Sequence, residues 1–169
     1  MNILSGGLFF SSLTYICQKM KIKFLFAIMI LLTSFMANAQ EVMIESQSKF
    51  GFTATVDSLS DVAVKNGWKV TMVHDLQETM KKNGKEVMPV KVLEICNPGL
   101  AYQILSKDEL RDASPMLPCR ISVYEKSDGK TYVSRMNAPA FAGMIGGDAA
   151  KTIIEAFKVA EGFVKAVTN

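Results

Sequence analysis

The sequence predicts an α+β domain: a two-layer sandwich of one mixed or antiparallel sheet with helices on one face. Segments that alternate between apolar and polar residues, as half-buried strands do, recur along the chain. Segments with apolar residues at helical spacing separate most of them. In one place Asp128-Gly129 joins two strand segments directly, which is typical of an antiparallel hairpin. The predicted order of elements is β-α-β-α-β-α-β-β-α.

The first half of this order rests on alternation and on turn residues. Residues 49–56 alternate between polar and apolar side chains, and Asp57-Ser58 can cap a helix that follows them. Asn66-Gly67 and Asn83-Gly84 each end a helix with a pair suited to the left-handed C-cap. The expected elements are a strand at 49–56, a helix at 59–65, a strand at 68–73, a helix at 76–82 and a strand at 90–96.

The second half ends in the clearest helix of the chain. Apolar residues recur there at helical spacing, from Ala150 to Val167, after a break at Gly146-Gly147. Arg120 and Arg135 are expected to point outward from their strands and to be solvated. The expected elements are helices at 98–105 and 108–113, strands at 119–125 and 131–136, and an amphipathic helix at 148–167.

A secretory leader precedes the predicted domain. Lys21 and Lys23 supply a positive start, residues 24–32 are apolar throughout, and Ala37-Asn38-Ala39 has the small residues of a cleavage site. The apolar run is shorter than the roughly 20 residues that a membrane-spanning helix needs. We therefore expect residues 1–39 to comprise an upstream extension and a signal peptide starting at Met20. Residues 40–169 are then a single exported, soluble domain without a membrane anchor.

The charge balance gives no support for a nucleic-acid partner. The whole chain has 19 basic and 16 acidic residues. Lys19, Lys21 and Lys23 all lie before the cleavage site, so 16 basic residues remain with the 16 acidic ones. The domain is therefore neutral, and we expect it to bind no nucleic acid.

Most sequence patterns of enzymes are absent. The chain has one histidine, which excludes a two-histidine zinc motif, and it has no G-x-S-x-G nucleophile elbow or phosphate-binding glycine loop. We therefore assign no catalytic residue and no cofactor, and the sequence favours a protein that is not an enzyme. Seven methionines follow residue 39, but their scatter is more typical of core packing than of soft-metal capture.

Cys96 and Cys119 are the chemically distinctive residues of the domain, and three arrangements are open. They can form a disulfide, which an oxidising compartment favours. They can instead be two separately buried thiols, or belong to a ligand or redox site. The pairing of their strands distinguishes these cases, because antiparallel strands bring the two cysteines together whereas parallel strands joined by a helix place them at opposite edges.

Polar residues complete the set of candidates. Asn97-Pro98 begins a helix, whose free backbone N–H groups can bind an anion. The single histidine, His74, shares strand parity with Trp68 and is expected at the end of a buried face. The candidate ligand-binding residues are His74, Cys96, Asn97, Pro98, Cys119 and Arg120.

Two motifs carry a family resemblance. The segment V-L-E-I-C-N-P-x-x-A begins at Val92, and L-P-C-R-I-S-V-Y-E begins at Leu117 and leads into the Asp-Gly hairpin. Together with N-G-W-K-V at Asn66, they resemble the domain of unknown function 302 family over about residues 44–146. The resemblance implies a small α/β sandwich that is often a homodimer, and it implies no particular activity.

Three functions are open at this point. The first is an exported binding module with a groove near Cys96, Asn97 and Cys119 for a small or soft ligand, such as a metal, haem or a sulfur compound. The second is a thiol-based redox or transfer protein with one cysteine as nucleophile, although the C-x-x-C spacing is absent. The third is a structural or interaction protein whose cysteine pair stabilises the fold.

Overall fold

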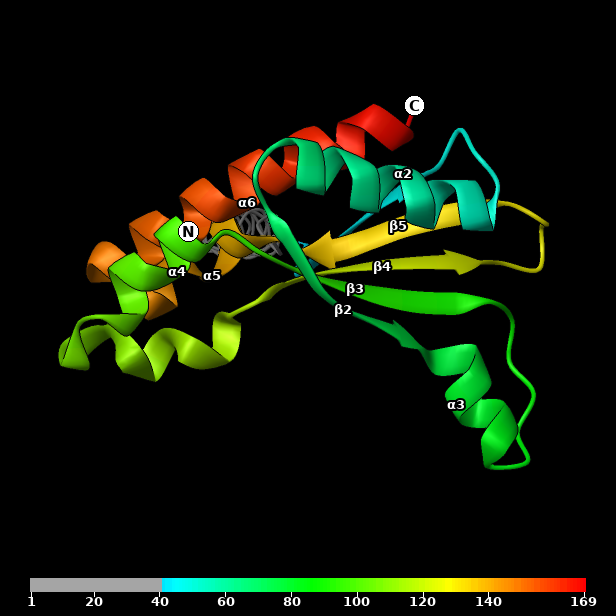
Figure 1. Ribbon diagram of the computed structural model, residues 1–169, viewed down its shortest axis with the longest axis horizontal. Coiled ribbons are helices and arrows are strands. Elements are labelled where there is room, and N and C mark those ends of the chain that lie inside the picture. Colours follow the sequence, from blue (N-terminus) through cyan, green and yellow to red (C-terminus); the bar gives the residue numbers. More distant parts are fainter. Residues whose placement is uncertain (1–40) are drawn as a thin grey trace, which may run out of the picture. The chain divides into compact units, whose positions relative to one another are not determined.

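Five antiparallel strands form one sheet in the order β1-β5-β4-β3-β2 in the computed structural model, which describes residues 41–169 (Figure 1). The predicted α+β fold with an antiparallel sheet is thereby confirmed. The predicted leader and its cleavage site after Ala39 lie outside the described residues. The strands are β1 (Met43–Gln47), β2 (Lys69–Asp75), β3 (Val90–Cys96), β4 (Cys119–Glu125) and β5 (Thr131–Met136).

The main helices lie on one side of this sheet. Helices α2 and α6 lie against one face, and α3 lies beyond the end of β2 (Figure 1). We call the opposite side of the sheet the outer face. Helix α5 and the 3₁₀ helix η1 pack near α6. The predicted order of elements lacks α5, and η1 extends past the predicted helix at 108–113 to Met116. The helices are α2 (Phe52–Lys65), α3 (Leu76–Lys82), α4 (Pro98–Leu105), η1 (Asp108–Met116), α5 (Ala138–Ile145) and α6 (Gly147–Val167).

The main core lies between the sheet and helices α2 and α6. Every second residue of the central strands is buried there, as the pleat of a half-buried sheet requires. Trp68 meets Phe163 of α6 edge-on, with ring centroids 5.5 Å apart and an interplanar angle of 87°. The buried strand residues of this core are Leu93, Ile95, Ile121, Val123 and Val133.

The strand predicted at 49–56 is wrong, because helix α2 begins at Phe52. Thr55 shows why the alternation is misleading in this segment. Its side chain is fully buried, and its hydroxyl donates to the carbonyl of Gly51 at 2.9 Å and lies 2.7 Å from the hydroxyl of Ser48. A polar residue in the core therefore imitates the polar side of a strand. The first strand is instead β1, an edge strand with exposed or half-buried side chains.

Strand β2 contains a bulge that changes which side chains face the core. Its pairing with β3 shifts register between Val70 and Met72. Trp68 is buried under the helices, whereas Met72 is 52% exposed. The side chain of His74 is 44% exposed, so the prediction that it ends a buried face is wrong. The bulge reverses the parity on which that prediction rests.

Candidate functional site

Two neighbouring strands of the sheet, β4 and β5, separate at one end, and we call this opening the fork. Strands β4 and β5 pair as far as Ile121 and Arg135. Beyond that pair, β4 continues to Cys119 beside β3, whereas β5 continues to Met136 beside β1. The adjoining segments run to different helices, η1 and α5 (Figure 1). The fork therefore leaves space between two strands that are neighbours elsewhere.

A cavity of about 320 Å³ lies at the fork. Small-molecule sites in proteins span about 300–1,000 Å³. Helix α6, the strand ends and the segment before β4 all contribute to its walls, which are mostly apolar. Its apolar lining includes Met43, Val92, Met116, Ile121, Met136, Ile153, Phe157, Ala160 and Val164. Its polar lining consists of Cys119, Arg120, Ser122, Ser134 and Arg135.

Methionines supply the adaptable part of this lining. Met43 and Met136 are partners across β1 and β5, and the two residues are 53% and 42% exposed. The expectation that the methionines fill the core is wrong for these two residues. Flexible thioether side chains at a cavity can adjust to ligands of different shape.

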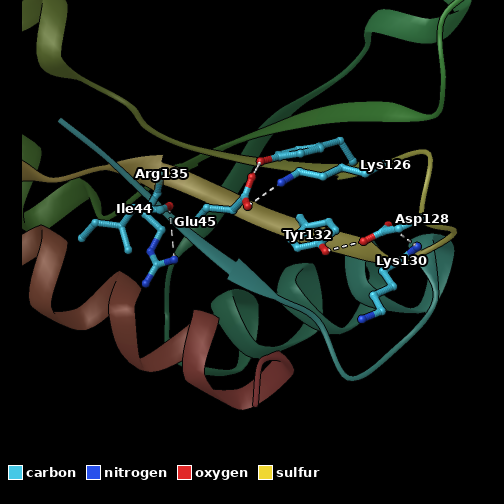
Figure 2. Close-up of polar contacts among 8 residues, drawn as sticks. Ile44, Glu45, Lys126, Asp128, Lys130, Tyr132 and Arg135 are labelled. Carbon is cyan, nitrogen blue, oxygen red and sulfur yellow. Dashed lines mark hydrogen bonds and ion pairs between the residues drawn. The ribbon is translucent and has the colours of Figure 1, made fainter. Parts of the chain in front are cut away.

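Arg135 points from β5 toward α6, and the expectation that it is solvated is wrong. Nε and Nη2 bind the two carboxylate oxygens of Glu161 at 2.5 and 2.7 Å. Nη1 donates to the hydroxyl of Ser46 at 2.9 Å. It also donates to the carbonyl of Ile44 at 3.4 Å (Figure 2). The side chain is only 9% exposed. Arg135 has the strand parity of buried Val133, and Glu161 supplies the opposite charge that a buried guanidinium requires.

Arg120 and His74, two of the predicted site residues, meet on the outer face at Glu94. His74 Nε2 and Arg120 Nη2 each lie 3.1 Å from Oε1 of Glu94, and Arg120 Nε donates to the same oxygen at 3.1 Å. The hydrogen bond from His74, followed by that from Arg120, lowers the pKa of the Glu94 carboxyl. Glu94 is therefore ionised at neutral pH, and it holds Arg120 in place at the cavity wall.

The charges of the cavity lining are of one sign. Arg120 and Arg135 carry positive charge, and no Asp, Glu or His belongs to the lining among the described residues. Their partners Glu94 and Glu161 contact the guanidinium groups without lining the cavity. Charges act more strongly beside apolar walls than in water. The described lining therefore carries positive charge alone, and the matching negative charges lie outside it.

Cys96 and Cys119 lie near each other, because β3 and β4 are antiparallel. Both line a second cavity of only about 10 Å³, next to Trp68 and Asn97, and Cys119 also lines the large cavity. Both cysteines are free thiols. Burial raises the pKa of Cys119 to about 11, and the neighbouring Cys96 adds to this effect. Cys119 is therefore protonated at neutral pH, whereas the thiolate is the form that acts as a nucleophile.

Asn97 and Pro98 organise the start of helix α4. The Asn97 side chain accepts hydrogen bonds from the backbone N–H groups of Gly99 at 3.0 Å and Leu100 at 3.1 Å. Pro98 is exposed and belongs to neither lining. The N–H groups expected to attract an anion are therefore engaged by the protein itself.

A polar cluster lies farther along the outer face and connects β1 to the hairpin (Figure 2). The hydroxyl of Tyr124 donates to Glu45, and Nζ of Lys126 donates to the other carboxylate oxygen of Glu45 at 2.6 Å. Tyr132 donates to Asp128 at 2.7 Å. Burial raises the pKa of Tyr124 to about 12, and the bond to Glu45 adds to this shift. Tyr124 therefore keeps its proton at neutral pH and can donate it to Glu45. The bonds from Tyr124 and Lys126 to Glu45 connect the edge strand β1 to the hairpin.

A family model described as "Domain of unknown function DUF302" matches residues 44–169. The chain belongs to this family. It is also similar to the crystal structure of an uncharacterized conserved DUF302 protein from Bacillus stearothermophilus. The TM-score is 0.61 at 23% sequence identity, over 75% of this chain and 95% of that chain, which shows a shared fold. No curated protein matches the chain.

Both motifs that resemble the DUF302 family border the two cavities. The C-N-P motif supplies Cys96 and Asn97 to the small cavity, and the L-P-C motif supplies Pro118 and Cys119 to both. Within residues 41–169 there is no group of three or more His, Cys, Asp or Glu side chains that could hold a metal ion. None of the helices in this part of the DUF302 chain is long and apolar enough to cross a membrane.

Sequence reasoning missed several residues that define the site. Glu94 connects two predicted residues, and Ser122, Ser134 and Phe157 line the large cavity. The sequence gives one signal for the ends of the diverging strands, which is a proline near each: Pro118 before β4 and Pro139 soon after β5. These prolines indicate where each strand ends, but they do not reveal that the two strands lead away from each other.

Proposed function

We propose that this DUF302 domain is a binding module that takes a small, mostly apolar ligand into the cavity at the fork. The observation that carries the proposal is the cavity itself, about 320 Å³ in volume, with mostly apolar walls and a few polar groups. Such a lining is typical of sites that bury an apolar body and orient it through a few polar contacts. We further propose that the domain acts after export, on the basis of the leader with its Ala37-Asn38-Ala39 cleavage pattern.

The chemistry of the lining favours such a ligand over the other candidates. The raised pKa of Cys119 gives little support to thiol redox or transfer chemistry at neutral pH. A metal cation would meet two guanidinium groups in the lining, Arg120 and Arg135, and no carboxylate or imidazole among the described lining residues. An uncharged thiol next to thioethers instead behaves as an apolar surface.

The test is binding of the neutral fluorophore N-phenyl-1-naphthylamine, which emits strongly in apolar surroundings. Ser122→Leu places a larger apolar side chain in the cavity lining, and Gln47→Leu makes a similar change on the same face of the sheet away from the cavity. We expect saturable binding to the wild type and to Gln47→Leu, and an affinity at least about tenfold lower for Ser122→Leu.

Circular dichroism establishes that each variant is folded, and Ser134→Leu replaces Ser122→Leu if the latter is not. Two results would overturn the proposal. One is the absence of saturable binding to the wild type, and the other is an equal affinity for the wild type and the folded cavity variant.

A further inference from the structure

We infer that the ligand of this cavity is an anionic amphiphile, with an apolar aliphatic or aromatic body and a single carboxylate that binds Arg120. This inference rests on the proposed function and names the class of ligand that the site would take. It depends on the charge of the lining, on the free donors of one arginine and on the apolar space next to it.

The charge of the lining distinguishes an acid from a neutral ligand. Both ionised groups of the described lining are guanidinium groups, and each carboxylate that neutralises them lies outside the lining. A ligand that contacts the described lining therefore meets guanidinium groups and no carboxylate. A carboxylate there gains a charge-assisted hydrogen bond, which is about twice as strong as a neutral one.

Within the described residues, one nitrogen of Arg120 contacts no acceptor, whereas all three nitrogens of Arg135 donate to the protein. Arg135 uses Nε, Nη1 and Nη2 in bonds to Glu161, Ser46 and Ile44. Arg120 contacts Glu94 through Nε and Nη2, and within the described residues its Nη1 contacts no acceptor. Its side chain is 67% exposed, so an incoming carboxylate reaches it without a change in the fold. Arg135 then contributes positive charge, and Arg120 contributes the direct contact.

Glu94 positions Arg120 and leaves one of its nitrogens without an acceptor within the described residues. Oε1 of Glu94 is shared between Arg120 and His74, each at 3.1 Å. Glu94 thereby holds the Arg120 side chain against the sheet, with Nη1 left for a second acceptor. The apolar body of the ligand would contact Val92, Ile153 and Phe157, which belong to the same lining. An aliphatic acid and an aromatic acid share this chemistry.

The experiment compares two ligands that differ in one group. Octanoate and 1-octanol have the same chain length, but at about pH 7.5 octanoate carries a full negative charge. Each is titrated against the wild-type protein loaded with N-phenyl-1-naphthylamine, and loss of fluorescence reports displacement. We expect octanoate to displace the probe at a concentration at least about tenfold lower than 1-octanol does, because a hydrogen bond to a charged group discriminates on this scale.

Variants of Arg120 then assign the preference to its guanidinium. We expect Arg120→Gln to weaken octanoate binding more than 1-octanol binding, so that the preference for octanoate falls to less than about threefold. We expect Arg120→Lys to retain part of this preference. Arg111→Gln is the matched control, because Arg111 pairs with Asp108 on η1 and does not line the cavity. It should keep the full preference.

The outcomes separate the two proposals. If the probe does not bind, the proposed function fails. If the probe binds but neither compound displaces it, the inference of an anionic ligand is overturned. If both compounds displace it equally well from the wild type, the cavity binds apolar ligands and the inference of an anionic ligand is overturned. A preference that survives in folded Arg120→Gln also overturns the inference, because the carboxylate would then be bound elsewhere.

Discussion

Arg135 places a positive charge between the sheet and helix α6. Its side chain is 9% exposed and that of Glu161 is 19% exposed, so both charges have lost most of their contact with water. Removing one partner of such a pair leaves the other uncompensated, whereas replacing both by apolar residues of similar volume is often neutral. The pair is therefore a sensitive point of the fold at the scale of single residues.

We predict that Glu161→Gln lowers the free energy of unfolding by about 3 kcal/mol. The double variant Arg135→Met/Glu161→Leu should lower the free energy of unfolding by less than half of that amount, because no buried charge remains unpaired. Urea unfolding followed by circular dichroism measures both values. Glu155→Gln, on the exposed side of α6, is the control and should change stability by less than about 0.5 kcal/mol. If the double variant were as unstable as the single one, loss of the buried charge pair would not explain the effect.

Cys119 and Tyr124 make stability depend on alkaline pH. The pKa of Cys119 is raised from 9.0 to about 11, and that of Tyr124 from 10.0 to about 12. Both groups are neutral when protonated, so folding favours their protonated forms. Their contribution to stability is fully present below the unfolded-state pKa values and is lost as pH rises through the folded-state values.

We therefore predict that the free energy of unfolding falls between pH 9 and pH 12. In Tyr124→Phe the part of this loss between pH 10 and pH 12 should be smaller, because no hydroxyl remains to titrate. Tyr102→Phe removes a tyrosine that is 71% exposed and should leave the profile unchanged. Urea unfolding at a series of pH values gives the profile. The explanation fails if Tyr124→Phe retains the full loss of stability.

At the scale of elements, helix α6 has two environments along its length. Phe163 is 4% exposed and contacts Trp68 in the main core, whereas Phe157 is half-buried and borders the large cavity. A side chain next to a cavity has fewer contact partners on that side. Two phenylalanines on one helix should therefore contribute differently to stability.

We predict that Phe163→Ala lowers the free energy of unfolding by about 3–5 kcal/mol, as expected for a fully buried phenylalanine. Phe157→Ala should cost about 1–2 kcal/mol, because the residue is half-buried and has fewer contacts to lose. Chemical denaturation of the two variants provides the comparison. Equal losses would contradict the presence of open space beside Phe157.

The elements that sequence analysis predicted well are those with strong local signals. The hairpin around Asp128-Gly129, strand β3 and helix α6 lie within one or two residues of their predicted limits. The prediction of a strand at 49–56 is wrong because the buried polar residue Thr55 imitates the polar side of a strand. The prediction that His74 is buried is wrong because a one-residue bulge in β2 reverses which face of the sheet the later side chains point to. Neither a buried hydroxyl nor a bulge has a distinct signature in a single sequence.

The candidate site was predictable only in part. Cys119 and Arg120 belong to the L-P-C-R motif, and both line the large cavity. The fork itself depends on which neighbour each strand keeps after Ile121 and Arg135 separate, and this is a property of the assembled sheet. The position of Arg135 likewise depends on Glu161, 26 residues later in the chain.

At the scale of the whole molecule, export is the property that the leader predicts. Lys21 and Lys23, the apolar run at 24–32 and Ala37-Asn38-Ala39 form the pattern of a cleaved signal peptide. We predict that the mature protein begins at Gln40 or at the pyroglutamate derived from it. Mass spectrometry of the protein recovered from its native cells identifies the N-terminus. An intact leader in a membrane fraction would contradict this prediction.

The cavity also belongs to the whole molecule, because its walls come from distant parts of the chain. Met43 begins β1, Met116 ends η1, Met136 ends β5, and Phe157 lies on α6. No short segment of the chain contains this lining, so the cavity forms only when the sheet and α6 have assembled. Ligand binding should accordingly stabilise the domain as a unit.

The sharpest test of a ligand site at the fork uses the methionines as reporters inside and outside the cavity. Met43, Met116 and Met136 line it, whereas Met72, Met80, Met88 and Met144 do not. Protein labelled with ¹³C at the methionine methyl groups is titrated with octanoate and followed by NMR. We predict saturable shifts of the three cavity methyl signals with a single affinity, and little change in the other four. Shifts confined to these other four methionines, or no saturable shift at any methionine, would contradict the claim that the fork is a ligand site.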